Sequence, residues 1–368
     1  MELIIGVLLL VLVFGAEISL YHHHGLDGLR YRCQFSTDEV TEGDTLEFTE
    51  TVENDKSLPV PWLKAELTTS KWLDFPENHC TVTDQTRFVT GFFSVRSHAK
   101  TRRVWHVQCE KRGIYQVEHV VLVTSDLLGA VRLSLGATDT GDTLTVLPQR
   151  YTKAGRLLPK LRLDQYGEAP VRFHLETDPC FPAGVRPYTS GDPYRRIHWK
   201  ATAHTNTLLV RQEEPVALQV ITVLLALQTS APDEGMMTRD KALLEHTIQV
   251  CAECLWELCQ GGWMVRLCIG ENGENGRMIE TPYGGGESTY RRMLEIMAGL
   301  TLDDAETVSH LLEFGKPGGH EATLLITPYT DDEIAQWKQK NNSYVLVTGH
   351  ARDRGNCADA IVDKFNSE

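Results

Sequence analysis

The chain has 368 residues, enough for two or three domains of ordinary size, and its 42% hydrophobic and 23% charged residues are typical of a folded protein. Its formal net charge of -14 argues against nucleic acid as the main partner, because phosphate binding requires a basic surface. The nine cysteines are odd in number and scattered, which favours a reducing compartment over a disulfide framework.

The N-terminus is apolar. Residues 3–16 read LIIGVLLLVLVFGA, and continuation to Tyr21 gives about the length that spans a bilayer. We interpret residues 1–21 as a membrane anchor; a cleaved signal peptide and a buried core helix are the alternatives. Glu2, rather than a basic residue, precedes the run, which speaks against a signal peptide. Because Arg30 and Arg32 follow it, the positive-inside tendency places the bulk of the chain in the cytoplasm.

Residues 28–150 alternate between hydrophobic and polar positions in short runs broken by turn residues such as Gly43. Several such strands in succession predict a β-sandwich. The stretch Pro59-Val60-Pro61-Trp62 predicts a connection rather than a central strand, because proline lacks the ladder donor, and we expect Trp62 to pack on the sandwich. Gly113 and Gly129 are predicted turn positions. The predicted strands are residues 45–49, 88–95, 104–109, 117–124 and 143–147.

The next part, residues 151–215, is a predicted linker that carries the densest cluster of unusual residues, from Gly184 to Glu214. Residues 188–193 form a turn signal, and Pro193 suits the first position of a short helix that Asp192 would cap. Residues 208–210 predict a strand.

Two interpretations of this cluster compete. In the first, its basic side chains bind an anionic group or an acidic partner surface. In the second, which we favour, the arginines pair with Asp192, Glu213 and Glu214 and lock the segment between two domains, with Tyr188 and Trp199 as packing anchors. The candidate residues are Arg186, Tyr188, Gly191, Asp192, Arg195, Arg196, His198, Trp199, Lys200 and Arg211.

A family resemblance follows from the spacing of these residues. The chain reads Gly184-x-Arg186-x-Tyr188-x-x-Gly191-Asp192-x-x-Arg195-x-Ile197-His198-Trp199-Lys200-Ala201-x-Ala203, then Leu208-x-Val210-Arg211. This string resembles the signature of the domain-of-unknown-function-58 family. Weaker similarities lie upstream, in Arg112-Gly113-x-Tyr115, Asp126-x-x-Gly129 and Val146-Leu147-Pro148. The resemblance implies a bacterial membrane protein, often encoded near a MoxR-type AAA+ ATPase, with no established biochemical activity.

Residues 216–368 alternate strand and helix patterns, which predicts an α/β domain with a doubly wound parallel sheet. By the family resemblance this domain is von Willebrand factor A-like. The predicted strands are residues 218–227, 264–269, 323–327 and 344–348, and the predicted helices are residues 241–259, 290–300, 331–340 and 357–365.

Domains of that kind often hold Mg²⁺ through an Asp-x-Ser-x-Ser motif after the first strand. Here Leu227-Gln228-Thr229-Ser230 occupies the position, so the leading aspartate is missing and we predict no conventional metal site. A displaced site using Asp233 and Glu234 is the alternative.

Two further motifs are interpreted as structural. Cys251-x-x-Cys254 lies inside a predicted helix rather than before one, which predicts buried cysteines rather than a redox or zinc site. Gly284-Gly285-Gly286 lacks the Lys-Ser/Thr continuation of a phosphate loop and predicts a flexible connector.

These observations favour a non-enzymatic, membrane-anchored scaffold without a cofactor. From the resemblance we expect it to work with a MoxR-type AAA+ ATPase in envelope assembly or stress. One alternative is an enzyme acting on an anionic substrate, with His198 as base and Asp192 orienting it. The other is a metal-dependent adhesion module outside the cell.

Overall fold

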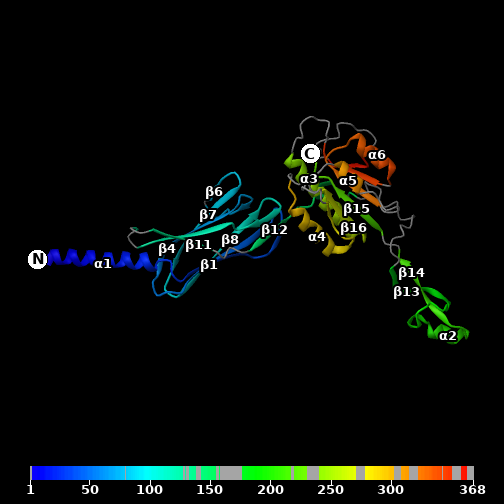
Figure 1. Ribbon diagram of the computed structural model, residues 1–368, viewed down its shortest axis with the longest axis horizontal. Helices are drawn as coiled ribbons and strands as arrows, with labels where there is room; N and C mark the ends of the chain where they lie inside the picture. Colours follow the sequence, from blue (N-terminus) through cyan, green and yellow to red (C-terminus); the bar gives the residue numbers. More distant parts are fainter. Residues whose placement is uncertain are drawn as a thin grey trace. The chain divides into compact units, whose positions relative to one another are not determined.

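The computed structural model describes residues 2–78, 80–126, 129, 132–137, 142–154, 157, 176–216, 219–229, 240–270, 278–301, 308–314, 322–341, 343–349 and 358–362. The chain divides into two compact units. The first comprises residues 1–149 and 294–300, and the second comprises residues 150–293 and 301–368. Figure 1 shows their elements coloured along the sequence.

Helix α1, Glu2–His24, forms the N-terminal element of the first unit (Figure 1). Its part from Ile4 to His24 is long and apolar enough to cross a membrane. At 1.5 Å per residue the helix is about 35 Å long, compared with about 30 Å for the hydrocarbon core of a bilayer. Large apolar side chains from Ile4 to Phe14 are exposed, as a lipid-facing helix requires.

The rest of the first unit is rich in strands. They form sheets with the orders β1-β3-β8-β5, β11-β10-β4-β7-β6 and β2-β12-β9. The strands are β1 Leu29–Phe35, β2 Glu39–Thr41, β3 Thr45–Asn54, β4 Val60–Ser70, β5 Leu73–Asp74, β6 Thr81–Val82, β7 Thr86–Val95, β8 Ala99–Cys109, β9 Gly113–Gln116, β10 His119–Ser125, β11 Arg132–Ala137 and β12 Thr143–Leu147.

One hydrophobic core contains side chains from both larger sheets, including Phe48 of β3, Leu63 of β4 and Leu122 of β10. The alternation that predicted strands also explains this core. In β1, for example, every second residue from Leu29 to Phe35 is buried and the intervening ones are exposed.

The prediction for Pro59 to Trp62 was wrong. Strand β4 begins at Val60 and lies between β10 and β7, so it is not at an edge. Proline is accommodated because the register shifts between Val60 and Leu63, and this bulge removes the ladder position that would need the missing donor. Trp62 contacts Phe92 with ring centroids 6.0 Å apart, and it remains partly exposed.

The upstream motif around Arg112 stabilises the first unit. Arg112 is buried, and its Nη1 donates to the carbonyl oxygens of Met297 (2.7 Å) and Ala298 (3.1 Å), which end helix α4, Gly286–Ala298. The last carbonyl groups of a helix have no donor within the helix, so the Arg112 guanidinium donates the hydrogen bonds that these groups would otherwise lack. Tyr115 Oη donates to the Arg112 carbonyl oxygen (3.1 Å) and so holds the same turn. This part of the family resemblance therefore has a structural explanation.

The second unit contains a mixed sheet with the order β17-β16-β15-β18-β19-β20. All neighbours pair in parallel except β16 and β17, which are antiparallel. Every residue of β15 and β18 is buried, as the continuous apolar runs predicted. The strands are β15 Val220–Leu225, β16 Met264–Gly270, β17 Met278–Glu280, β18 Ala322–Thr327, β19 Ser343–Val347 and β20 Ala360–Ile361.

Three longer helices alternate with these strands, as expected from the sequence. They are α3 Lys241–Gln260, α4 and α6 Asp332–Lys340, and shorter segments are α5 Val308–Phe314 and the 3-10 turn η1 Thr152–Ala154. The predicted helix at residues 357–365 was wrong in its described part, because residues 360–361 form β20 and pair in parallel with β19. A two-residue strand at a sheet edge is too short for its apolar pattern to be separated from a helical one.

The three glycines before α4 are not a loose connector. Gly284 exchanges backbone hydrogen bonds with Val265, and a Cβ on Gly284 would lie 2.5 Å from Thr289 Oγ1. Gly286 has a φ of +76° and begins α4. Close approach and a left-handed backbone therefore explain two of the three glycines.

Candidate functional site

The signature forms an antiparallel hairpin with a helical tip. Strands β13, Glu176–Pro187, and β14, Leu209–Val216, pair with each other (Figure 1). Between them lie the 3-10 turn η3, Tyr194–Arg196, and helix α2, Trp199–Thr205. We call residues 184–211 the signature arm.

Backbone contacts close the tip onto the strands. The His198 amide donates to the Leu209 carbonyl oxygen (2.8 Å), and the Tyr188 amide donates to that of Leu208 (2.9 Å). Ile197 and Val210 form a further bridge and are both buried. They provide the small apolar centre of the arm.

A polar network organises the turn before η3. Arg186 makes a two-point contact with Asp192, with Nη1 to Oδ2 at 2.7 Å and Nη2 to Oδ1 at 2.5 Å. The Thr189 amide (2.9 Å) and hydroxyl (2.7 Å) also donate to Asp192 Oδ2. Hydrogen bonds from Arg186 and then from Thr189 lower the pKa of Asp192 well below its usual value. Asp192 therefore stays charged and holds the turn over a wide pH range.

Asp192 does not cap a helix as predicted. The residue before η3 is Pro193, which has no side-chain cap, and Asp192 is used by Arg186 instead. Helix α2 is capped by His198, whose Nδ1 accepts a hydrogen bond from the Ala201 amide (3.1 Å). It ends at Asn206 in the left-handed conformation.

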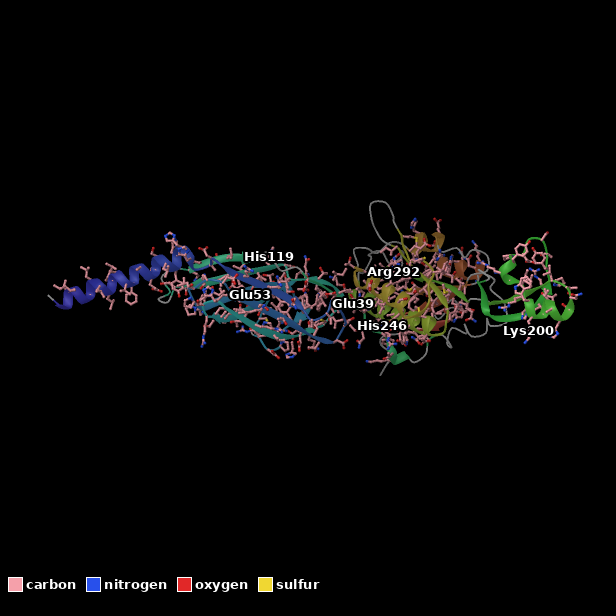
Figure 2. The ribbon with its side chains drawn as sticks, turned by 90° about the horizontal axis from the view of Figure 1, so that it is seen from below. Glu39, Glu53, His119, Lys200, His246 and Arg292 are labelled. Carbon is pink, nitrogen blue, oxygen red and sulfur yellow. The ribbon has the colours of Figure 1, made fainter. Side chains whose placement is uncertain are left out.

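The aromatic and basic residues of the tip point to solvent. Trp199 is 67% exposed and Tyr194 is 75% exposed, and Arg195 and Lys200 are also exposed. Lys200 is labelled on this tip in Figure 2. The expectation that Trp199 is a packing anchor was wrong, because its side chain is exposed; polar contacts between Arg186 and Asp192 stabilise the arm.

Other predicted residues lie on the same arm. Tyr188 is half-buried and stacks on Tyr194, with ring centroids 6.0 Å apart and 18° between the planes. Gly191 is exposed in the turn, and Arg211 of β14 is exposed and pairs with Val185. The side chains of residues 212–218, including Glu213 and Glu214, lie outside the described set. Sequence reasoning did not select Tyr194, although its position in the basic turn beside Tyr188 could have indicated it.

Comparison with known proteins identifies the family. The family described as "Protein of unknown function DUF58" matches residues 184–347. Over these residues, which make up less than half of the chain, the sequence is similar to the DUF58 family. The DUF58 match begins at Gly184, the first residue of the signature arm, and ends at Val347, the last residue of β19. The predicted resemblance is thereby confirmed for this part of the chain.

Other comparisons do not extend this assignment. No curated protein matches the sequence. Among solved structures, a CARDB domain from Pyrococcus furiosus is 12% identical, with 30% of this chain and 91% of that chain covered and a TM-score of 0.20. A non-cellulosomal cohesin from Archaeoglobus fulgidus is 10% identical, with 32% of this chain and 91% of that chain covered and a TM-score of 0.24. The sporulation control protein Spo0M from Bacillus subtilis is 15% identical, with 32% of this chain and 49% of that chain covered and a TM-score of 0.19. Scores this low assign neither fold nor function.

The signature arm does not bring together His198 and Asp192, the pair that the enzyme alternative requires. Both oxygens of Asp192 accept hydrogen bonds from Arg186, and one also accepts from Thr189. His198 Nδ1 accepts from the α2 backbone. Each group therefore has a local structural role, and the described contacts do not pair them with each other.

After β15, the position that would hold the leading aspartate of a metal site is occupied by Gln228, which has a structural role. Gln228 is buried, and its Oε1 accepts a hydrogen bond from the Val308 amide (3.1 Å) at the start of α5. Within the described ranges, no group of three or more His, Cys, Asp or Glu side chains has metal-binding geometry. Asp233 and Glu234, which the displaced-site alternative needs, lie outside those ranges.

The cysteine pair of the DUF58 region is buried inside α3. Cys251 and Cys254 are both free thiols. Burial raises the pKa of each thiol well above its usual range, which disfavours the thiolate that redox chemistry requires.

Proposed function

We propose that this protein is a membrane-anchored interaction protein that presents the tip of the signature arm to a protein partner. The observation that carries the proposal is the exposure of Trp199 and Tyr194 beside the exposed cations Arg195 and Lys200. Grouped exposed aromatics mark binding surfaces, and Trp, Tyr and Arg dominate the energies of protein interfaces.

The frame of the arm supports this role. The Arg186–Asp192 contact and the Thr189 hydrogen bonds stabilise the turn that carries the tip. They do not involve the side chains of Trp199 or Lys200. A preorganised surface loses less conformational entropy on binding. The exposed cations favour an acidic patch on the partner.

By family resemblance, the partner we propose is a cytoplasmic MoxR-type AAA+ ATPase, and the process is envelope assembly or stress. Helix α1 would then be a single-pass anchor with the bulk of the chain in the cytoplasm. The sheet order with an antiparallel edge strand supports a von Willebrand factor A-like domain, and the shared core of the two larger sheets supports a β-sandwich.

Capture of a co-expressed MoxR-type ATPase by the full-length, detergent-solubilised protein tests this function. The double variant Tyr194→Ala/Trp199→Ala should reduce capture by at least about tenfold, since each such side chain at the centre of an interface can contribute about 2 kcal/mol. The matched control is Phe88→Ala/Phe92→Ala, which removes two exposed aromatics from β7 and should leave capture unchanged. Equal capture by wild type and the tip variant would refute the role of the arm.

A further inference from the structure

A groove on the first unit is basic in an otherwise acidic protein. Its volume is about 710 Å³, and its lining includes four cations, Arg30, Arg32, Lys100 and Arg102, but one carboxylate, Glu53. We call the groove that these four cations line the basic groove. The chain as a whole has a net charge of -14, so this concentration of positive charge is local.

The strand register explains how the cations come together. Across β1, β3 and β8, Arg30 faces Glu53, which in turn faces Lys100. Two residues further on, Arg32 and Arg102 face Thr51 from either side. Because alternate residues of a strand point to one face, the two rows lie on the same outer surface of the sheet. Glu53, labelled in Figure 2, lies between the first pair.

Two of these cations contact carboxylates. Lys100 Nζ contacts Glu53 Oε1 (2.5 Å), and Arg30 Nη2 contacts Asp55 Oδ2 (2.8 Å). Arg102 Nη2 instead donates to the neutral hydroxyl of Thr49 (3.2 Å). Among the residues that line the groove, four are cations and one, Glu53, is a carboxylate.

The end of α1 is attached to the same unit. Tyr21 is buried and its hydroxyl donates to the Pro59 carbonyl oxygen (3.1 Å). Lys56 Nζ donates to the carbonyl oxygens of His24 (2.7 Å) and Gly25 (2.5 Å), where the helix ends. These contacts hold the start of β1 next to the end of the apolar helix.

This attachment places the basic groove close to a membrane that α1 would cross. The two rows of cations begin one and three residues after Leu29, the first residue of β1. At about 3.3 Å per residue, they lie within roughly 10 Å of the end of the strand nearest α1. A lipid surface near that end of the strand would be separated from these charges by about the Debye length, which is about 8 Å at physiological ionic strength.

We propose that the basic groove binds the phosphate groups of anionic phospholipids in the membrane that holds α1. Arginine guanidinium groups suit phosphate oxygens because they donate two parallel hydrogen bonds. The groove also includes the partly exposed Leu135 and the backbone of Gly136, which provide apolar contact for the glycerol part of a lipid. Lipid binding would orient the β-rich unit on the membrane, independently of any partner at the signature arm.

The test uses full-length protein in nanodiscs of phosphatidylcholine, with or without phosphatidylglycerol. Hydrogen–deuterium exchange of β1 and β8 is measured for wild type, for Arg32→Gln/Arg102→Gln and for Lys71→Gln/Lys111→Gln. The last variant is a matched control, because it removes two cations that flank Trp72, outside the groove. A further arm adds inorganic phosphate to phosphatidylcholine discs.

We expect phosphatidylglycerol to slow exchange in wild type and in the control variant. The groove variant should need at least about tenfold more anionic lipid for the same protection, since each cation near a charged membrane surface contributes about 1 kcal/mol. Three results would overturn the proposal. The first is equal protection of the wild-type protein in both kinds of disc, and the second is a loss of protection in the control variant as large as that in the groove variant. The third is full protection by inorganic phosphate in phosphatidylcholine discs.

Discussion

The replacement of Glu50 tests how the core of the first unit tolerates a buried carboxylate. Glu50 is only 3% exposed. Its Oε1 accepts a hydrogen bond from Tyr31 Oη (2.6 Å), and its Oε2 accepts one from Trp105 Nε1 (2.5 Å). In Glu50→Ala the buried hydroxyl of Tyr31 and the partly buried Nε1 of Trp105 both lose their acceptor. An unsatisfied buried donor costs about 1–3 kcal/mol, so we expect roughly 2–6 kcal/mol of destabilisation.

Glu50→Gln should cost much less, because an amide oxygen still accepts from Trp105 while the Tyr31 hydroxyl can turn and accept from the amide nitrogen. Its dependence on pH is more informative than its size. Burial raises the pKa of Glu50, although hydrogen bonds from Tyr31 and Trp105 oppose the shift. A raised pKa means that the folded protein holds the proton more tightly than the unfolded chain does. The contribution of Glu50 is therefore full below about pH 4.5 and is lost as the pH rises through the folded pKa.

The stability difference between wild type and Glu50→Gln should accordingly widen as the pH falls from neutral. Hydrogen–deuterium exchange of β3 and β8 in the full-length protein measures it locally. Glu53→Gln on the same strand is the control, because the hydrogen bond from Lys100 lowers the pKa of Glu53. For Glu53 the difference should narrow on acidification. Equal pH dependence in the two variants, or a Glu50→Ala protein as stable as wild type, would refute the account.

Three further changes have defined outcomes. Asp192→Asn should speed hydrogen exchange throughout the signature arm at neutral pH, whereas wild type should stay protected below the usual aspartate range because the pKa of Asp192 is lowered. Gly91→Ala should lower the melting temperature, since its Cβ would lie 3.2 Å from Arg103 Nη1 and from Glu50 Oε2; tight packing of this kind costs about 1–3 kcal/mol. Cys251 and Cys254 should resist alkylation at about pH 8 in folded protein and react once urea unfolds it, as mass spectrometry would show.

Elements with a strong local pattern could be predicted from the sequence. The buried runs of β15 and β18 and the alternation of β12 have one interpretation each, because burial on two faces or on one face dictates which positions are apolar. The errors occur where a neighbouring segment decides the outcome. The bulge that admits Pro61 into β4 depends on its register with β7, and β20 exists because residues 360–361 find the edge of β19.

The basic groove was missed for the same reason. Arg30 and Arg32 were visible as charges after an apolar segment, and Lys100 and Arg102 lie seventy residues away in the chain. Only the pairing of β1 and β8 with β3 brings them to one surface. Local patterns predict strands, but they do not predict which strands become neighbours.

The signature cluster separates into two layers with different roles. Arg186 forms an ion pair with Asp192, and His198 Nδ1 accepts a hydrogen bond from the α2 backbone. These residues therefore build the frame of the arm. Trp199 and Lys200 are exposed above it. Replacing a frame residue should therefore disorder the arm and abolish partner capture together. Replacing a tip residue should reduce capture while the hydrogen exchange of the arm stays at the wild-type level, and this combination distinguishes a docking surface from a clamp.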